Sequence, residues 1–174
     1  MRIAHPEISA IAEIIDLNNK YLIHNLTESQ QRNGFLGKKY SHEELERIIL
    51  DKEIIIAIDH GKIAGYYLIG QKDDDGTAPY ERNKAIEQLI TDEVPSSKIA
   101  WPCSVCIDDA YRGQGLFGSM LQALMQAVKG KYSYVLCSIS EKNIASVKAH
   151  LNNGWELINT FEERQYFLYN LTFH

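Results

Sequence analysis

The sequence contains only three cysteines in 174 residues, Cys103, Cys106 and Cys137. Their number is odd and all three lie in apolar, strand-like segments, which is typical of buried, reduced thiols in a cytoplasmic protein. The spacing Cys103-x-x-Cys106 is that of a metal or redox pair, but neither a second pair nor a histidine cluster accompanies it. Residues three apart in a strand also face opposite sides. We therefore expect reduced thiols and no metal site.

Long apolar runs and clusters of basic residues are also absent. No run approaches the length of a membrane span, and residues 1–6 lack a signal-peptide pattern. The chain carries 18 Lys and Arg against 23 Asp and Glu, a formal net charge of −5. Since phosphate contacts need a basic surface, this balance argues against nucleic-acid binding. We expect a cytoplasmic protein that binds neither membranes nor nucleic acids.

Apolar residues make up 45% of the chain, which suits a single domain over residues 1–174. Ser41 and Glu44 form a capping-box pattern, which predicts the start of a helix. His60 is expected in a hairpin turn rather than in a catalytic role. Residues 72–76 are expected to form a solvated loop. Apolar periodicity predicts helices near residues 8–19, 41–49, 79–90, 116–128 and 140–153. β-rich runs predict strands near residues 2–4, 53–58, 62–70, 99–107, 132–139, 155–161 and 165–173.

The most informative stretch joins a predicted strand to a predicted helix through a glycine-rich turn at residues 108–118. The helix after it, residues 116–128, has no charged residue and carries apolar side chains at helical spacing. Such a helix start directs several unpaired backbone N–H groups and the positive end of the helix dipole outward. This arrangement suits a phosphate or pyrophosphate, and glycine lets the phosphate approach the backbone.

The glycines alone leave more than one interpretation open. Gly113, Gly115 and Gly118 match the dinucleotide pattern Gly-x-Gly-x-x-Gly, which is weak evidence by itself. That pattern normally opens a βαβ unit near the start of a domain, with an acidic residue about 20 positions on, whereas residues 129–139 hold no Asp or Glu. The Lys-Ser/Thr ending of a P-loop is missing. A dinucleotide oxidoreductase and a plain strand-to-helix turn are the remaining alternatives.

The arginine before the glycines favours a different phosphate ligand. Tyr111-Arg112-Gly113-Gln114-Gly115-Leu116 resembles the acetyl-CoA pyrophosphate loop of the GNAT superfamily of N-acetyltransferases, whose pattern is Arg/Gln-x-x-Gly-x-Gly/Ala. Arg112 and Gly115 match this pattern. Phe117 stands where the family has Gly or Ala, and Gly118, one position later, is expected to supply the small residue.

A second stretch, residues 143–155, resembles the same family. Members show Asn-x-x-Ala/Ser, then a Tyr, then three residues and Gly-Phe. In this chain Asn143 begins the pattern, His150 stands at the Tyr position and Trp155 replaces Phe. Because Asn143 and His150 are separated by two helical turns, they share one helix face. We expect this pair to line a narrow cleft.

The resemblance implies a fold and a set of cofactor contacts. The fold is α/β (mixed α+β), a three-layer GNAT-like arrangement with helices on both faces of a central mixed, mostly antiparallel sheet of six to seven strands. The strand before the glycine turn and the strand 132–139 form a splayed parallel pair, and the pantetheine arm of acetyl-CoA (coenzyme A) pairs with the first like an added β-strand. The implied cofactor-binding residues are Val105, Cys106, Ile107, Arg112, Gly113, Gln114, Gly115, Leu116, Phe117, Gly118 and Asn143.

The implied activity is acetyl transfer from acetyl-CoA to a primary amine of a small molecule or protein, by direct attack in a ternary complex. His150, where relatives place the Tyr near the thioester sulfur, is the candidate acid for the departing thiolate, and Tyr166 is a weaker candidate. Phe35 and Leu36 either fill the core or contact the substrate. An acetyl-CoA-binding sensor without turnover is the alternative. The acceptor, the general base, the acyl length and the choice between monomer and homodimer stay open.

Overall fold

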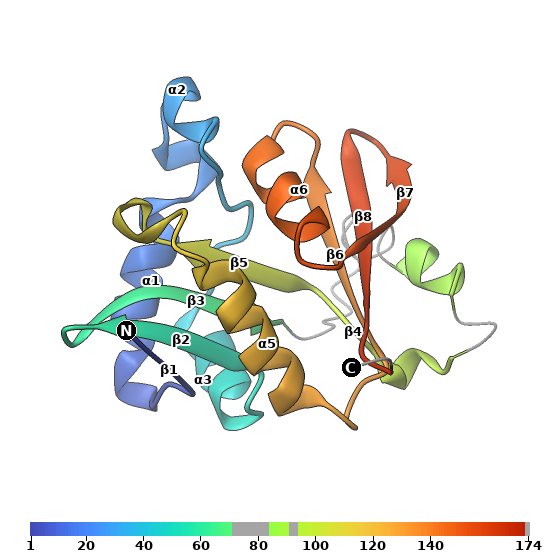
Figure 1. The fold of residues 1–174 in the computed structure, drawn as a ribbon, viewed down its shortest axis with the longest axis horizontal. Coiled ribbons are helices and arrows are strands. Elements are labelled where there is room, and N and C mark those ends of the chain that lie inside the picture. The colour runs from blue at the N-terminus through green and yellow to red at the C-terminus, as the bar shows by residue number, and fades with distance from the viewer. Residues whose placement is uncertain (71–83, 91–93, 173–174) are drawn as a thin grey trace.

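The structure, a computed structural model, describes residues 1–70, 84–90 and 94–172. The strands of these residues form two four-stranded sheets (Figure 1). The first sheet is antiparallel throughout, in the order β1 (Arg2–Ala4), β2 (Ile54–Asp59), β3 (Lys62–Ile69) and β5 (Cys103–Ile107). The second has the order β4 (Ile99–Ala100), β6 (Tyr134–Ser140), β8 (Arg164–Asn170) and β7 (Glu156–Phe161).

The strand predicted over residues 99–107 is two strands that belong to different sheets. β4 runs parallel to β6 as far as Ala100, which pairs with Val135. After Trp101 and Pro102 the chain leaves β6, and β5 pairs with β3. Pro102 has no N–H to donate to a ladder, which favours a break here. The mixed α+β class and the splayed parallel pair are confirmed, but the described residues form eight strands in two sheets rather than one sheet of six to seven.

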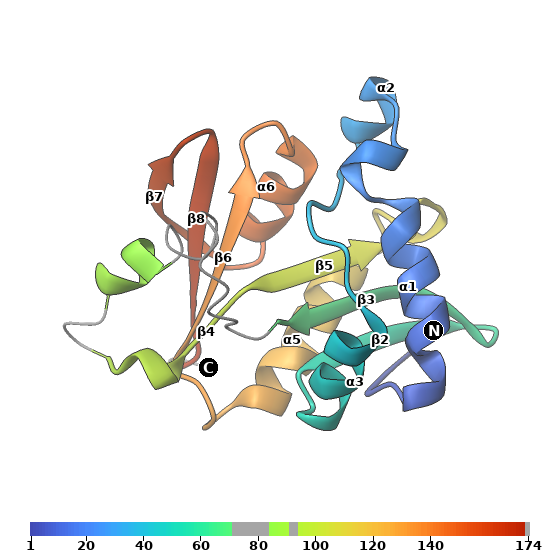
Figure 2. The ribbon, with the colours of Figure 1, turned by 180° about the vertical axis from the view of Figure 1, so that it is seen from behind.

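Helices cover both faces of the first sheet. α5 (Leu116–Val128) lies on one face (Figure 1), and α1 (Ile11–Lys20) and α3 (His42–Leu50) lie on the other (Figure 2). α6 (Ile144–Leu151) packs on the second sheet, beside α5. The shorter helices are α2 (Glu28–Gln31) and the 3-10 turns η1 (Ile8–Ala10), η2 (Ile23–Asn25), η3 (Ser96–Lys98) and η4 (Asp109–Tyr111).

The two large cores follow from the alternation of side chains along the strands. Ile56 of β2 packs against α1 and α3, while its neighbour Ile55 packs on the α5 side. In β3 the adjacent residues Tyr66 and Tyr67 are both fully buried, on opposite faces of the same sheet. A third, smaller cluster lies under the helical residues 84–88. The first sheet is therefore buried on both faces at β2 and β3.

The local predictions hold where the structure describes the residues. In the capping box that begins α3, the Glu44 N–H donates to Ser41 Oγ at 3.1 Å and the Ser41 N–H donates to Glu44 Oε2 at 2.8 Å. His60 lies in the turn between β2 and β3, with a φ of 46°. The loop predicted at residues 72–76 and the helix start predicted near Pro79 lie outside the described residues. Among the described helices, none has the length and apolarity needed to cross a membrane.

Candidate functional site

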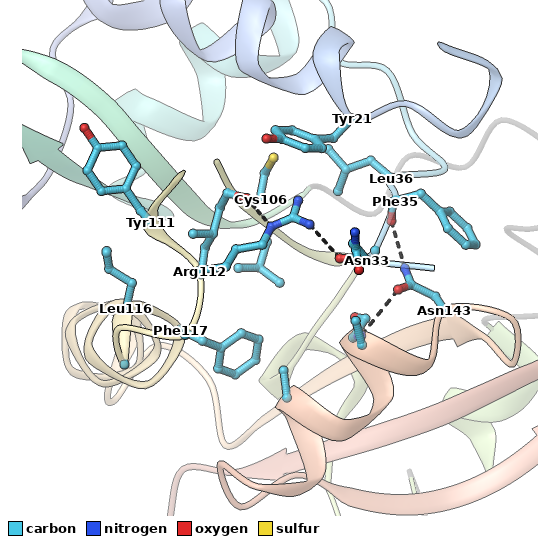
Figure 3. Close-up of a pocket in the computed structure, with 18 residues that line it drawn as sticks. Tyr21, Asn33, Phe35, Leu36, Cys106, Tyr111, Arg112, Leu116, Phe117 and Asn143 are labelled. Atoms are coloured by element: carbon cyan, nitrogen blue, oxygen red, sulfur yellow. Dashed lines mark hydrogen bonds between the residues drawn. The ribbon is translucent and has the colours of Figure 1, made fainter. Parts of the chain in front are cut away.

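A cavity of about 390 Å³ opens where β5 and β6 splay apart, and we call this space the wedge. Its walls come from β5, the glycine turn with the start of α5, the start of α6, and residues 33–36, a segment that we call the strap (Figure 3). The lining residues are Tyr21, Asn33, Gly34, Phe35, Leu36, Val105, Cys106, Ile107, Tyr111, Arg112, Gly113, Gly115, Leu116, Phe117, Asn143, Ala145, Ser146 and Ala149.

The glycine turn presents bare backbone to this cavity. Gly113 and Gly115 have φ values of 74° and 76°, in the left-handed region that glycine adopts without strain. A Cβ built on either residue would meet no atom within 4 Å, so the space beside them is open. Within the described residues, the backbone N–H groups of residues 113–118 donate to no protein acceptor. These groups and the α5 dipole together form a site for an anion.

Gly118 has a packing role in the contact between α5 and the chain after α6. A Cβ at this position would lie 2.7 Å from Asn153 Oδ1, so Gly118 permits close contact between α5 and the chain after α6. Gly118 does not line the cavity. Gln114 is also turned away, because its Nε2 donates to the Ala110 carbonyl at 3.2 Å. Gly113 and Gly115 therefore line the cavity, while cofactor contact through the backbone of Gln114 and Gly118 stays a prediction.

The acidic residues that begin the turn are neutralised from α1. Lys20 Nζ lies 2.8 Å from Asp108 Oδ2 and 3.4 Å from Asp109 Oδ1. The pKa of Lys20 is raised, mainly by its hydrogen bond to Asp108. The Asp109 N–H donates to the Tyr21 hydroxyl at 2.7 Å. These contacts fix the turn against α1 and offset two carboxylates that would otherwise repel an anion.

One edge of β5 faces the wedge. The Asp108 N–H donates to the Ala64 carbonyl of the β3 side at 2.9 Å. Because hydrogen-bonded pairs alternate in an antiparallel ladder, the backbone of Cys106 also faces β3, while the N–H and C=O groups of Val105 and Ile107 face the wedge. Of the three strand residues predicted to hold the pantetheine arm, Val105 therefore offers its N–H and C=O groups and Ile107 its N–H, since the Ile107 carbonyl accepts from Arg112 Nε.

Arg112 ties the turn to the strap. Its Nε donates to the Ile107 carbonyl at 2.9 Å, and its Nη1 donates to the Asn33 carbonyl at 2.6 Å (Figure 3). The guanidinium also lies over the Tyr21 ring, 4.7 Å from the ring centroid. The arginine of the motif thus lines the cavity, with its charge directed at the strap.

Asn143 holds the opposite end of the strap. Its Oδ1 accepts from the Ser146 N–H at 3.3 Å, which caps α6, and its Nδ2 donates to the Phe35 carbonyl at 2.8 Å (Figure 3). Gly34 lies between the two anchored carbonyls, with a φ of 108°. The strap therefore crosses the wedge and is bonded to both of its walls.

His150 does not line the cavity beside Asn143. It is 3% exposed, its Nδ1 donates to the Ser146 carbonyl at 2.8 Å, and its ring packs 5.0 Å from that of Phe117 and 5.1 Å from that of Trp155. Burial lowers the pKa of His150 to about 4, so the imidazole is neutral at pH 7. Both features argue against a general acid at this position. The acid role stays a prediction, which substitution can decide.

The other side chains predicted to act on substrate are mostly core residues. Tyr166 is fully buried in the third cluster with Trp101, away from the cavity lining. Leu36 packs in the core beneath α1 and α3, and its backbone pairs with Leu22. Phe35 lines the cavity. Leu36 also lines the cavity, so it belongs to both the core and the site, and substrate contact by Phe35 or Leu36 stays a prediction.

The cysteine pair is divided between two cores. Cys106 lies on the α1 side, with its Sγ 3.9 Å from the Leu17 carbonyl, whereas Cys103 packs on the α5 side. Burial raises the pKa of each thiol to about 12, so both are protonated at neutral pH. Cys103 and Cys106 thus face opposite sides of β5, as the strand periodicity predicts.

Two groups of lining residues were not among the residues predicted to form the site. Tyr21 and Asn33 reach the site from a loop some 80 residues before the glycine turn, and Arg112 contacts both. The only local sign was the turn pattern Asn33-Gly34. Ala145 and Ala149, on α6, line the cavity as small residues that leave room beside the strap.

A family model described as the acetyltransferase (GNAT) family matches residues 17–155 of this chain. No curated protein matches. Among solved structures, an N-acetyltransferase from Staphylococcus aureus Mu50 is similar over 98% of each chain, with 18% identity and a TM-score of 0.65. A ribosomal-protein-alanine N-acetyltransferase from Brucella melitensis is similar over 98% of this chain and 99% of its own, with 15% identity and a TM-score of 0.64.

A further similar structure is a phosphinothricin acetyltransferase from Sinorhizobium meliloti in complex with acetyl-CoA. The similarity covers 97% of this chain and 87% of that one, with 12% identity and a TM-score of 0.64. At these identities the three structures establish a shared fold. The family model covers the strap, the glycine turn and α6, which are the elements that build the wedge.

Proposed function

Because this chain belongs to the GNAT acetyltransferase family, we propose that it transfers the acetyl group of acetyl-CoA to a primary amine by direct attack in a ternary complex. The observation that carries the proposal is the open glycine turn at the start of α5, placed at the wedge beside a free strand edge. The same chain thus offers an anion site and an extended backbone edge within one cavity.

The residues present fit the two ends of the donor molecule. The N–H groups of residues 113–118 would hold the pyrophosphate, since Gly113 and Gly115 leave the approach to the backbone open. Val105 and Ile107 would pair with the amide groups of the pantetheine arm, as an added strand does. Asn143 and Arg112 would enclose the arm by holding the strap in place.

The chain's own groups then assist transfer in two ways. When bound, acetyl-CoA supplies the activated acetyl group as a thioester. A Val105 or Ile107 N–H directed into the wedge would donate to the carbonyl oxygen as negative charge develops there. Holding the amine and the thioester in one cavity removes much of the entropic barrier to their reaction. The acceptor is a primary amine on a small molecule or a protein.

Two measurements test this proposal. Acetyl-CoA at about 100 times its dissociation constant should raise the free energy of unfolding by about 2.7 kcal/mol, which a thermal melt detects. A panel of primary amines should then include at least one that releases thiol from acetyl-CoA in proportion to enzyme. Absence of any melting shift and of any calorimetric heat would contradict the proposal. Binding without thiol release across the panel would instead favour an acetyl-CoA sensor.

A further inference from the structure

A second cavity, of about 310 Å³, lies beside β4, at the end of β5 that is far from the glycine turn (Figure 1). Its walls come from the chain between α3 and β2, the residue after β3, the segment from η3 to Trp101, and the chain between α5 and β6. We call this space the basal cavity. Among the described residues, none lines both this cavity and the wedge. Its volume is enough for a small organic molecule.

A buried carboxylate, that of Glu53, forms part of the wall of the basal cavity. Glu53 is 2% exposed and lies between α3 and β2. Its N–H donates to the Ile48 carbonyl of α3 at 3.0 Å, and its carbonyl accepts from the Ile69 N–H of β3 at 2.9 Å. The backbone of Glu53 is therefore fixed between a helix and the first sheet, and the protein itself holds the carboxylate in place.

The described residues satisfy only one of the two carboxylate oxygens. Oε1 of Glu53 accepts from Lys131 Nζ at 2.6 Å and from the Tyr132 hydroxyl. No donor within residues 1–70, 84–90 and 94–172 reaches Oε2. A carboxylate accepts several hydrogen bonds, and a buried charge is costly unless it is paired and hydrogen-bonded. Because Glu53 is buried and lines the cavity, a partner for Oε2 would come from the cavity.

The charges that line the basal cavity favour a cation. Two carboxylates, those of Asp51 and Glu53, and one ammonium, that of Lys131, face it, which leaves one negative charge. Lys98, in the adjoining η3, does not line the cavity, and its Nζ donates instead to the carbonyls of Gly130 and Lys131, each at 3.2 Å. A ligand with one positive charge would therefore neutralise the lining, whereas an anion would face the unpaired carboxylate oxygen.

The groups around the basal cavity suit an alkylammonium ion rather than a metal ion. Within the part of the chain that the structure describes, no three His, Cys, Asp or Glu side chains are arranged to hold a metal ion. A primary ammonium group has three N–H donors, and the hydroxyl oxygens of Ser96 and Ser97 line the cavity as further acceptors beside Glu53. Ile99 and Ala100, both buried, add an apolar surface for an alkyl chain.

We propose that the basal cavity binds a small alkylammonium ion, whose N–H groups donate to Glu53 Oε2 and whose alkyl chain packs on Ile99 and Ala100. This site is separate from the wedge, because residues 102–104 lie between the last residue of β4's segment that lines the basal cavity, Trp101, and the first residue of β5 that lines the wedge, Val105. Binding here forms and breaks no covalent bond and needs no acetyl-CoA. The site therefore goes beyond the proposed acetyl transfer.

Trp101 lines the basal cavity and can report on its occupant. The chain contains two tryptophans, so Trp155→Phe leaves Trp101 as the single one. In this variant, butylammonium chloride at constant ionic strength should change the Trp101 fluorescence along a saturable curve. Butanol, which lacks the charge, and tetramethylammonium, which has the charge but no N–H donor, should give no saturable change. Calorimetry with butylammonium on the wild-type protein should show the same binding.

Two substitutions should move the affinity in opposite directions. Glu53→Gln keeps an oxygen for Lys131 and Tyr132 but replaces Oε2 by an N–H donor, so affinity for butylammonium should fall at least about 10-fold. Lys131→Met removes the cation that competes for Glu53, so affinity should rise; Lys131 is 48% exposed, which favours folding of this variant. Glu13→Gln makes the same change at a carboxylate outside the cavity and should retain affinity.

Absence of both a saturable fluorescence change and calorimetric heat with butylammonium would overturn the basal site. Equal affinity in Glu53→Gln and wild type would also overturn it, by placing the amine elsewhere in the protein, for example in the wedge. If Glu53→Gln does not fold, Lys131→Met decides, since higher affinity supports the site and unchanged affinity contradicts it. Failure of the protein to bind or cleave acetyl-CoA would contradict only the proposed acetyl transfer, because the basal cavity shares no lining residue with the wedge among the described residues.

Discussion

The side-chain amide of Asn143 fastens the strap to α6, because its Nδ2 donates a hydrogen bond of 2.8 Å to the carbonyl oxygen of Phe35, 108 positions away in sequence. The same side chain caps α6 through Oδ1 and Ser146 N–H. One residue of the family pattern thus joins the helix that forms one wall to the strap that crosses the cavity.

Substitution of Asn143 should therefore affect stability and donor binding separately. Asn143→Ala loses the cap and the bond to the strap, and we expect the free energy of unfolding to fall by about 1–2 kcal/mol. Asn143→Asp keeps an oxygen to cap α6 but places a carboxylate against the Phe35 carbonyl. It should fold with near-normal stability and bind acetyl-CoA more weakly, by calorimetry. Equal affinity in Asn143→Asp and wild type would show that the strap does not enclose the donor.

The glycine turn can be tested against a remote glycine of the same conformation. Gly115→Val places a side chain beside the exposed N–H groups of α5, so acetyl-CoA affinity should fall at least about 10-fold, the equivalent of about 1.4 kcal/mol. Gly61 has a similar φ of 80°, also with no atom within 4 Å of a built Cβ, but lies in the β2–β3 turn. Gly61→Val should lose comparable stability and retain affinity. Unchanged affinity in folded Gly115→Val would place the pyrophosphate elsewhere.

The burial of His150 predicts the result of removing it. A neutral imidazole behind Phe117 contributes packing, so His150→Phe should keep kcat within a few-fold at saturating acetyl-CoA. Loss of a general acid would instead reduce kcat by about 10²–10⁴-fold at unchanged acetyl-CoA affinity. His150→Tyr serves as the comparison, since it restores the residue that relatives carry. If kcat fell by that amount in His150→Phe and partly recovered in His150→Tyr, His150 would again be a candidate for the general acid.

His150 should also make stability depend on pH. Its pKa is lowered from 6.5 to about 4 in the folded protein, so the unfolded chain takes up a proton at higher pH than the folded one. The contribution of neutral His150 is therefore full above pH 6.5 and is lost as pH falls toward 4, by up to about 3 kcal/mol. Denaturant unfolding at neutral and acidic pH measures this loss. His150→Phe should lose less stability than wild type over this window, and identical curves would contradict the assigned pKa.

The sequence alone was sufficient for the elements that depend on near neighbours. The capping box at Ser41, the turn at His60 and the buried α5 follow from patterns within a few residues, because capping, turns and helical periodicity are local interactions. The Gly113–Gly115 turn was identified for the same reason, since a positive φ beside a helix start requires glycine. The two patterns shared with the family also predicted the splayed pair of parallel strands, which the structure confirms.

Only the tertiary structure decided what each motif residue contacts. Arg112 bonds to the strap, Gly118 contacts Asn153, and His150 lies beneath Phe117, and each outcome depends on which helix or loop packs opposite. A helical wheel places Asn143 and His150 on one face but does not state whether that face meets a cavity or a core. In the same way, the alternation of β3 predicts that Tyr66 and Tyr67 point apart, whereas only long-range packing decides that the Tyr66 hydroxyl meets Asn18 of α1.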